Sequence, residues 1–226
     1  MTLPPTPAAA DRVAIELQGF PLGPYQTNCY VVRPAGHNEC WIVDASFSPR
    51  PLVDAVRKWG ATPTAIILTH GHIDHLAGVD EVRRAFPNLP VLIHEAETHW
   101  TSDPQANLSA FSGMPTTCHG PDRTLKHDQV LTLGASRWRV LHVPGHSPGS
   151  IALVCENAAS PMAISGDALF AGSIGRTDFP GCSQAALANS IRTRLYTLDP
   201  ATEIFPGHGP STTIGHEMRT NPYVRA

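Results

Sequence analysis

The apolar segment AIIL at residues 65–68 leads directly into THGHIDHLAG at residues 69–78. The second segment holds three histidines and one aspartate within six residues, and imidazole and carboxylate groups are the ligands that bind zinc, iron or manganese. In a helical zinc motif two histidines stand four residues apart, whereas His70 and His72 alternate here around Gly71. The pattern predicts a metal-binding loop at a strand end, with a solvent-exposed histidine-rich loop as the alternative.

Three later apolar segments, each expected to be a strand, also run into a histidine or an aspartate. The loops that follow them contain PGHSPGS (144–150), GD (166–167) and PGHGP (206–210). Functional residues often lie on loops that a rigid sheet holds in place. The chain therefore offers seven candidate metal ligands: His70, His72, Asp74, His75, His146, Asp167 and His208.

The order of these motifs resembles the metallo-beta-lactamase superfamily, in which HxHxDH, a later PGH, a GD and a final GH supply a two-metal site. The resemblance implies a four-layer α/β/β/α sandwich with the ligand loops along one edge. Asp44, which ends the segment WIVD, resembles the superfamily's first motif, an aspartate that supports the site. The first metal would take His70, His72 and His146, and the second would take Asp74, His75 and His208, with Asp167 bridging.

The segment GDALFAGSIGRTDFPG at residues 166–181 is similar to the short, single-domain members of the glyoxalase II group, the hydroxyacylglutathione hydrolases. The related persulfide dioxygenases share its GRTDF portion. Arg176 could form an ion pair with Asp178 that braces the loop, or it could bind an anionic part of the substrate. Classical glyoxalase II enzymes carry a helical domain after the last metal histidine. Because only eighteen residues follow His208 here, we expect a more open cleft.

The resemblance implies hydrolysis of S-acyl thioesters such as S-lactoylglutathione. Two divalent metal ions, preferentially zinc with iron or manganese as alternatives, would lower the pKa of a bound water from 15.7 towards ~7, and hydroxide would attack the thioester carbonyl. Asp74 and Asp167 are the expected catalytic residues, and Arg176 is the expected substrate-binding residue. The main alternative is a mononuclear-iron dioxygenase acting on glutathione persulfide, which would need only two histidines and one carboxylate.

Composition indicates a single domain over residues 12–226, preceded by a flexible tail at residues 1–11. A net charge of −3 with only 16 Lys and Arg argues against nucleic acid as a partner. No apolar run reaches the roughly 20 residues that span a bilayer, and no signal peptide is evident. We therefore expect a cytoplasmic protein, a monomer or homodimer, whose partner is a small thioester, with glutathione as one candidate thiol.

Hydrophobic patterns predict the elements that carry these loops. Helices are expected at residues 52–59, 79–86 and 184–198, and His142 is expected to be a strand residue or a neighbour of the ligands. The irregular residues 100–121 are expected to form an ordered lid in which Leu108, Phe111 and Met114 pack. Strands are expected at residues 13–17, 28–32, 40–43, 65–69, 91–94, 130–133, 138–143, 150–154 and 162–165.

Overall fold

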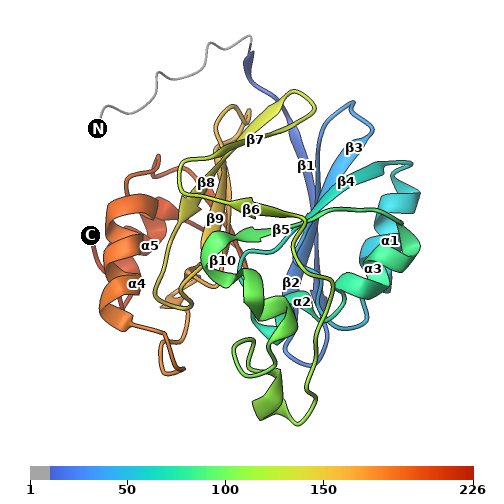
Figure 1. Ribbon diagram of the computed structural model, residues 1–226. Helices are drawn as coiled ribbons and strands as arrows, with labels where there is room; N and C mark the ends of the chain where they lie inside the picture. The colour runs from blue at the N-terminus through green and yellow to red at the C-terminus, as the bar shows by residue number, and fades with distance from the viewer. Residues whose placement is uncertain (1–10) are drawn as a thin grey trace.

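Two six-stranded sheets pack face to face, and helices cover the outer face of each (Figure 1). The computed structural model describes residues 11–226, so the predicted tail, apart from Asp11, lies outside the described residues. The four-layer α/β/β/α sandwich expected from the sequence is confirmed. None of the helices within residues 11–226 is long and apolar enough to cross a membrane.

The first sheet follows chain order, from β1 to β6. Its first three strands pair antiparallel, while β3 to β6 pair parallel. Parallel neighbours need crossover connections, so α1 lies between β3 and β4, α2 and α3 lie between β4 and β5, and residues 95–122 connect β5 to β6. The strands are β1 (Ile15–Leu22), β2 (Thr27–Pro34), β3 (Glu39–Val43), β4 (Thr62–Ile67), β5 (Val91–His94) and β6 (Arg123–Leu125), and the helices are α1 (Arg50–Lys58), α2 (Ile73–Leu76) and α3 (Val79–Ala85).

The second sheet has the order β14-β13-β10-β9-β8-β7, and only its β10 and β13 pair parallel. The crossover between those two strands contains a small hairpin and the helix that covers this sheet. The strands are β7 (Val130–Leu133), β8 (Ser136–His142), β9 (Ile151–Cys155), β10 (Met162–Gly166), β13 (Glu203–Pro206) and β14 (Thr212–Thr213), the hairpin is β11 (Leu169–Phe170) with β12 (Ser173–Ile174), and the helical segments are α4 (Gln184–Ser190), η4 (Ile191–Leu195) and α5 (Ile214–Thr220).

Three apolar cores fill the spaces between the four layers. The central core lies between the sheets and includes Trp41 and Trp138, whose ring centroids are 6.0 Å apart. Trp138 is fully buried, and its indole N–H donates to Ser136 Oγ at 2.9 Å, so its polar atom is satisfied. One outer core packs α1 and α3 on the first sheet, and the other packs α4 and α5 on the second. Because apolar contacts fix both sheets, the loops at their shared edge have a rigid support.

Several predicted boundaries were wrong. The first strand begins at Ile15 and continues to Leu22, while Val13 makes only an isolated bridge to Ala158. Gly19 and Pro21 are poor strand residues by propensity, but pairing with β2 overrides that preference. Gly19 is needed there, because a Cβ atom would lie 2.9 Å from the ring of Tyr30. The helix expected at residues 184–198 is α4 followed by the wider turn η4, which ends at Leu195.

The predicted lid is ordered but packs less than expected. It begins in the last turn of η2 (Glu95–Ser102) and contains η3 (Ser109–Ser112). Asn107 is buried, and its side chain donates to the carbonyl oxygens of Trp100 and Thr116 at 2.9 and 3.0 Å. The expectation that Phe111 and Met114 pack was wrong, because 69% and 48% of their surfaces are exposed.

Candidate metal centre

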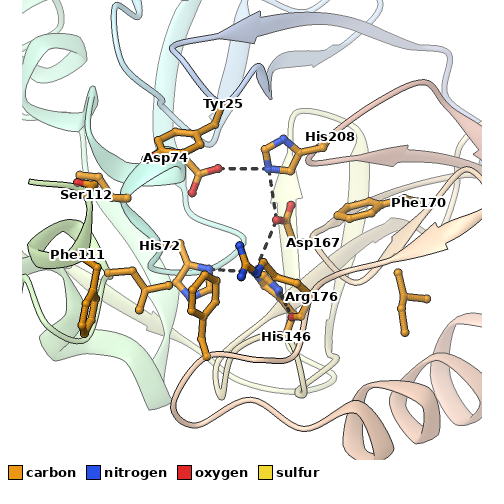
Figure 2. A pocket seen from close by; sticks show the side chains of 14 residues that line it. Tyr25, His72, Asp74, Phe111, Ser112, His146, Asp167, Phe170, Arg176 and His208 are labelled. Carbon is orange, nitrogen blue, oxygen red and sulfur yellow. Dashed lines mark hydrogen bonds and ion pairs between the residues drawn. The ribbon is translucent and has the colours of Figure 1, made fainter. Parts of the chain in front are cut away.

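All seven candidate ligands meet at one edge of the sandwich, beyond the strand ends. Figure 2 shows five of them: His72, Asp74, His146, Asp167 and His208. His70 and His72 follow β4, and Asp74 and His75 lie in α2. The second sheet supplies the other three ligands: His146 between β8 and β9, Asp167 after β10 and His208 after β13. The structure thus brings together side chains from both sheets.

The first group is a triangle of imidazole nitrogens. His72 Nδ1 lies 3.0 Å from His70 Nε2 and 2.9 Å from His146 Nε2, and the last two atoms are 3.2 Å apart. His146 Nδ1 donates to the carbonyl oxygen of Arg176 at 2.8 Å, which leaves a lone pair on its Nε2. The spacing is close to the edge of about 3.3 Å in a tetrahedral site with zinc–nitrogen distances of about 2.0–2.1 Å. These donors fit a cation.

The second group combines two imidazoles with carboxylates. Asp74 Oδ2 lies 3.2 Å from His208 Nε2 and 3.4 Å from His75 Nε2. Asp167 reaches both groups, since its Oδ2 lies 3.4 Å from His208 Nε2 and 3.6 Å from His146 Nε2. Among the described residues, His75 Nε2 and Asp167 Oδ1 are buried without a hydrogen-bond partner. A metal ion would satisfy both orphaned atoms.

Burial and neighbouring charges give the ligands of the two groups different protonation states. Burial, reinforced by the other imidazoles, lowers the pKa of His72 to about 3 and holds that of His70 well below its usual value. Burial alone would raise the pKa of Asp167, but the His75 and His208 imidazoles hold it well below the ordinary range. Burial opposes charge on His208, yet hydrogen bonds to Asp167 and Asp74 raise its pKa to about 9. The first group therefore offers neutral nitrogens and the second offers ionised carboxylates, while, against the effect of burial, the same carboxylates raise the pKa of His75 and His208. A cation bound at the second group would take the place of the protons on these two imidazoles, so metal binding there would release protons.

Asp44 supports the centre as the sequence suggested. It is 1% exposed and accepts hydrogen bonds from the N–H and the hydroxyl of Thr69, both at 2.8 Å. Its Oδ2 also lies 2.9 Å from His75 Nδ1, which orients Nε2 of that ring towards Asp74 and Asp167. Asp44 adopts a φ of 60°, a left-handed conformation that Asp tolerates better than most residues. It therefore positions a ligand without belonging to either group.

Sequence reasoning missed Glu97, a fully buried carboxylate in η2. Its Oε2 accepts from the N–H of Gly71 at 2.6 Å, and its Oε1 accepts from the N–H of Gly149 at 2.5 Å. Burial raises the pKa of Glu97, although these hydrogen bonds act in the opposite direction. Glu97 therefore clamps the loop that carries His70 and His72 to the loop that carries His146. A buried acid in an otherwise polar turn gave no sequence pattern that could reveal this role.

Glu97→Gln is expected to lower the free energy of unfolding by about 1–3 kcal/mol, because its amide NH2 would face one of the two backbone N–H donors and leave it unsatisfied. Urea denaturation of the metal-loaded protein measures this change. The matched control is Glu95→Gln in the same segment, whose exposed carboxylate pairs with Lys126 at 3.3 Å. That variant should change the stability by less than about 0.5 kcal/mol. Equal stability of the two variants would contradict the clamp.

A cavity of about 520 Å³ opens over the two groups, within the range of roughly 300–1,000 Å³ for small-molecule sites. Arg176 lies in its wall, and its guanidinium donates to both carboxylate oxygens of Asp178 at 2.7 Å. The ion pair that the sequence offered as one role of Arg176 is therefore present. Both side chains are more than half exposed, so the pair adds little stability by itself. The loop is held instead by the Arg176 carbonyl, which accepts from His146.

His142 and Cys182 lie outside the ligand set. His142 ends β8 and stacks on His94 with ring centroids 4.0 Å apart, as a strand residue outside the ligand set. Cys182 is half-buried, and its thiol donates to the carbonyl oxygen of His146 at 2.7 Å. Burial raises the pKa of Cys182, which disfavours a thiolate nucleophile.

Comparison with known proteins agrees with this geometry. A family model described as the metallo-beta-lactamase superfamily matches residues 22–208. The probable metallo-hydrolase YqgX of Bacillus subtilis is 37% identical over 206 residues, which cover 91% of this chain and 95% of that protein. The hydroxyacylglutathione hydrolase GloC of Haemophilus influenzae is 29% identical over 214 residues, which cover 94% of this chain and 99% of that protein.

Solved structures give the same result. The BLEG-1 B3 metallo-beta-lactamase has a TM-score of 0.87 and 40% identity, and the match covers 93% of this chain and 100% of that one. TTHA1623, solved in a di-iron-bound form, has a TM-score of 0.79 and 37% identity, with 92% of this chain and 100% of that one covered. These proteins share the architecture over almost all of the described residues.

Proposed function

The chain belongs to the metallo-beta-lactamase superfamily as a metallo-hydrolase, and from this premise we propose that its substrates are S-acyl thioesters, as in glyoxalase II enzymes. The observation that carries the proposal is the placement of Asp167 between a neutral three-histidine group and a carboxylate-containing group. Similarity to GloC, a hydroxyacylglutathione hydrolase, supports the thioester class. The reaction forms a carbon–oxygen bond and breaks the carbon–sulfur bond, so that water and thioester give a carboxylic acid and a thiol.

Two divalent ions are proposed for the centre. His70, His72 and His146 would hold one, Asp74, His75 and His208 would hold the other, and Asp167 would bridge them. Zinc is the preferred metal in this proposal. Iron and manganese are alternatives, because imidazole and carboxylate ligands suit all three metals. The di-iron form of TTHA1623 keeps iron as a serious alternative. When bound, such ions lower the pKa of water and polarise a carbonyl oxygen.

The protein's own groups orient the reactants and move the proton. Thr27 Oγ1 donates to Asp74 Oδ2 at 2.8 Å and fixes the direction of this carboxylate beside the cavity. The His75 and His208 imidazoles hold the pKa of Asp74 well below the usual range against the effect of burial, so this carboxylate stays ionised and would accept a hydrogen bond from the water. A carboxylate of such low pKa is a weak base, so it would hold the proton that water loses only on its way to the departing thiolate. The departing thiolate is a good leaving group and takes up the proton after it leaves, so the chain needs no strong general acid. Arg176, in the cavity wall, would bind an anionic part of the substrate if Asp178 released it.

Zinc-loaded protein is expected to release free thiol from acyl thioesters, S-D-lactoylglutathione among them. Chelation should reduce the rate by about 100-fold or more, because the nucleophile depends on the metal, and added zinc should restore it. Thiol release followed with a colorimetric reagent, beside elemental analysis of the same sample, checks both statements. The proposal would be wrong if fully metallated protein released no thiol from any of a panel of acyl thioesters.

A further inference from the structure

The cavity over the metal centre has a mainly apolar wall beyond the ligands. Its lining includes Leu108 and Phe111 from the lid, and Phe170, Ile174 and Phe179. Figure 2 shows Phe111 and Phe170 on opposite sides of the ligands. Tyr25 completes the rim, and 46% of its surface is exposed. Large apolar side chains that gather around an open site usually mark a surface that binds an apolar ligand.

Hydrogen bonds within the lid hold Phe111 in its exposed position. Besides its two donated bonds, Asn107 accepts at Oδ1 from the N–H of Ser109 at 3.0 Å, and its own carbonyl accepts from the N–H of Ile73 at 2.9 Å. Leu108 adopts a φ of 68°, a strained conformation for a branched side chain. The lid is thus tied to α2 of the metal centre, and it holds Leu108 and Phe111 at the cavity.

The same cavity offers little to an anionic ligand. Among the described residues that line it, Arg176 is the one Lys or Arg side chain. Asp178 takes two of its donors, and the guanidinium lies over the ring of Phe179 at 4.0 Å. The ion pair holds the pKa of Asp178 at about 2, so Asp178 stays ionised and competes with any ligand anion for Arg176. Glutathione carries carboxylates at both ends, and either of them would have to displace Asp178 to pair with Arg176.

We propose that the preferred substrates are S-acyl thioesters whose remaining parts are apolar and uncharged, with an aliphatic acyl chain seated among Leu108, Phe111 and Phe179. This inference rests on the proposed thioester hydrolysis. It assigns a specificity-determining role to the lid and to the Arg176–Asp178 pair. Glutathione conjugates are then accepted through their thioester group, without recognition of the tripeptide.

The test measures kcat/KM of the zinc-loaded protein for acetyl, butyryl and hexanoyl thioesters of N-acetylcysteamine, a short neutral thiol. Each added methylene should raise kcat/KM by about two- to fourfold until the cavity is filled, at the transfer energy of a buried methylene. Comparing kcat/KM for the lactoyl ester of the same thiol with that for S-D-lactoylglutathione measures the contribution of the thiol portion alone. The neutral ester should be cleaved at least as efficiently as the glutathione ester.

Two variants assign the effect to named residues. Phe111→Ser should lower the ratio of hexanoyl to acetyl kcat/KM by about fivefold or more, because the apolar wall loses an aromatic ring. Met114→Ser on the same loop is the control, since Met114 is exposed and lies outside the lining, and its ratio should equal that of the wild type. Asp178→Asn should free Arg176 and raise the kcat/KM for S-D-lactoylglutathione relative to the neutral lactoyl ester.

The possible failures are distinct. Cleavage of S-D-lactoylglutathione about tenfold better than its neutral counterpart, or a flat response to acyl length, would overturn the apolar specificity and leave thioester hydrolysis intact. An unchanged ratio in Phe111→Ser would remove the role of the lid. Absence of hydrolysis for every thioester in the fully metallated protein would remove the proposed function, and the specificity with it.

Discussion

His208→Ala should lower bound zinc from about two ions per chain to about one and reduce thioester hydrolysis by about 1,000-fold, because the shared activation of water and carbonyl needs both ions. His208 supplies the nitrogen that lies 3.2 Å from Asp74 and 3.4 Å from Asp167. The three-histidine group does not contain it. The first ion should therefore remain bound. Elemental analysis and steady-state rates of thiol release measure the two effects.

His216→Ala is the matched control, since His216 is an exposed histidine on α5, away from both groups. It should keep the metal content and the rate of the wild type. The persulfide dioxygenase alternative makes the opposite forecast for the first variant. About one iron per chain in the wild type, oxygen uptake with glutathione persulfide, and retention of that iron after His208→Ala would replace the hydrolase assignment.

Gly207→Ala is expected to reduce thioester hydrolysis by about 100-fold, because displacement of a catalytic group by about 1 Å can cost that much. A Cβ atom at residue 207 would collide with Asp167 Oδ1 and lie 2.9 Å from His75 Cε1. The backbone cannot retreat easily, since the Gly207 N–H donates to Gly166 at 2.8 Å and its carbonyl accepts from the N–H of Asn28 at 2.7 Å. The Asp167 carboxylate must therefore move.

Gly120→Ala separates this effect from a general cost of adding a methyl group. Gly120 is exposed and has nothing within 4 Å of an added Cβ atom. Its activity and metal content should match the wild type, whereas Gly207→Ala should also lose stability by about 1–3 kcal/mol. Wild-type kinetics in Gly207→Ala would show that the Asp167 carboxylate tolerates displacement and would contradict its role as the bridging group.

Much of the fold was readable from the sequence because the informative contacts are local. Each predicted ligand follows an apolar strand within a few residues, so strand and loop could be recognised together at His70, His146 and His208. Asp44 was recognisable for the same reason, since it directly follows β3. The alternation of apolar segments and helical patterns then predicted the layers, although the short strands β6, β11, β12 and β14 are too brief to leave a pattern.

The remaining features depend on contacts between distant segments. Glu97 accepts from residues 26 and 52 positions away in the chain, and nothing in its immediate neighbours distinguishes it from a surface acid. Phe111 was expected to pack because large apolar residues usually do. The hydrogen bonds of Asn107 fix the lid in a form that leaves Phe111 at the cavity mouth. The role of Glu97 and the exposure of Phe111 both depend on contacts between segments that are distant in the sequence.

Each sheet is built from one continuous half of the chain, and each proposed metal group takes ligands from both halves. A bound ion would therefore link the two halves of the chain reversibly, in addition to its role in catalysis. Binding to the native state alone stabilises it by about 4 kcal/mol when free metal is 1,000 times its dissociation constant. Metal supply would then change the free energy of unfolding of the whole chain, in addition to the stability that its three apolar cores provide.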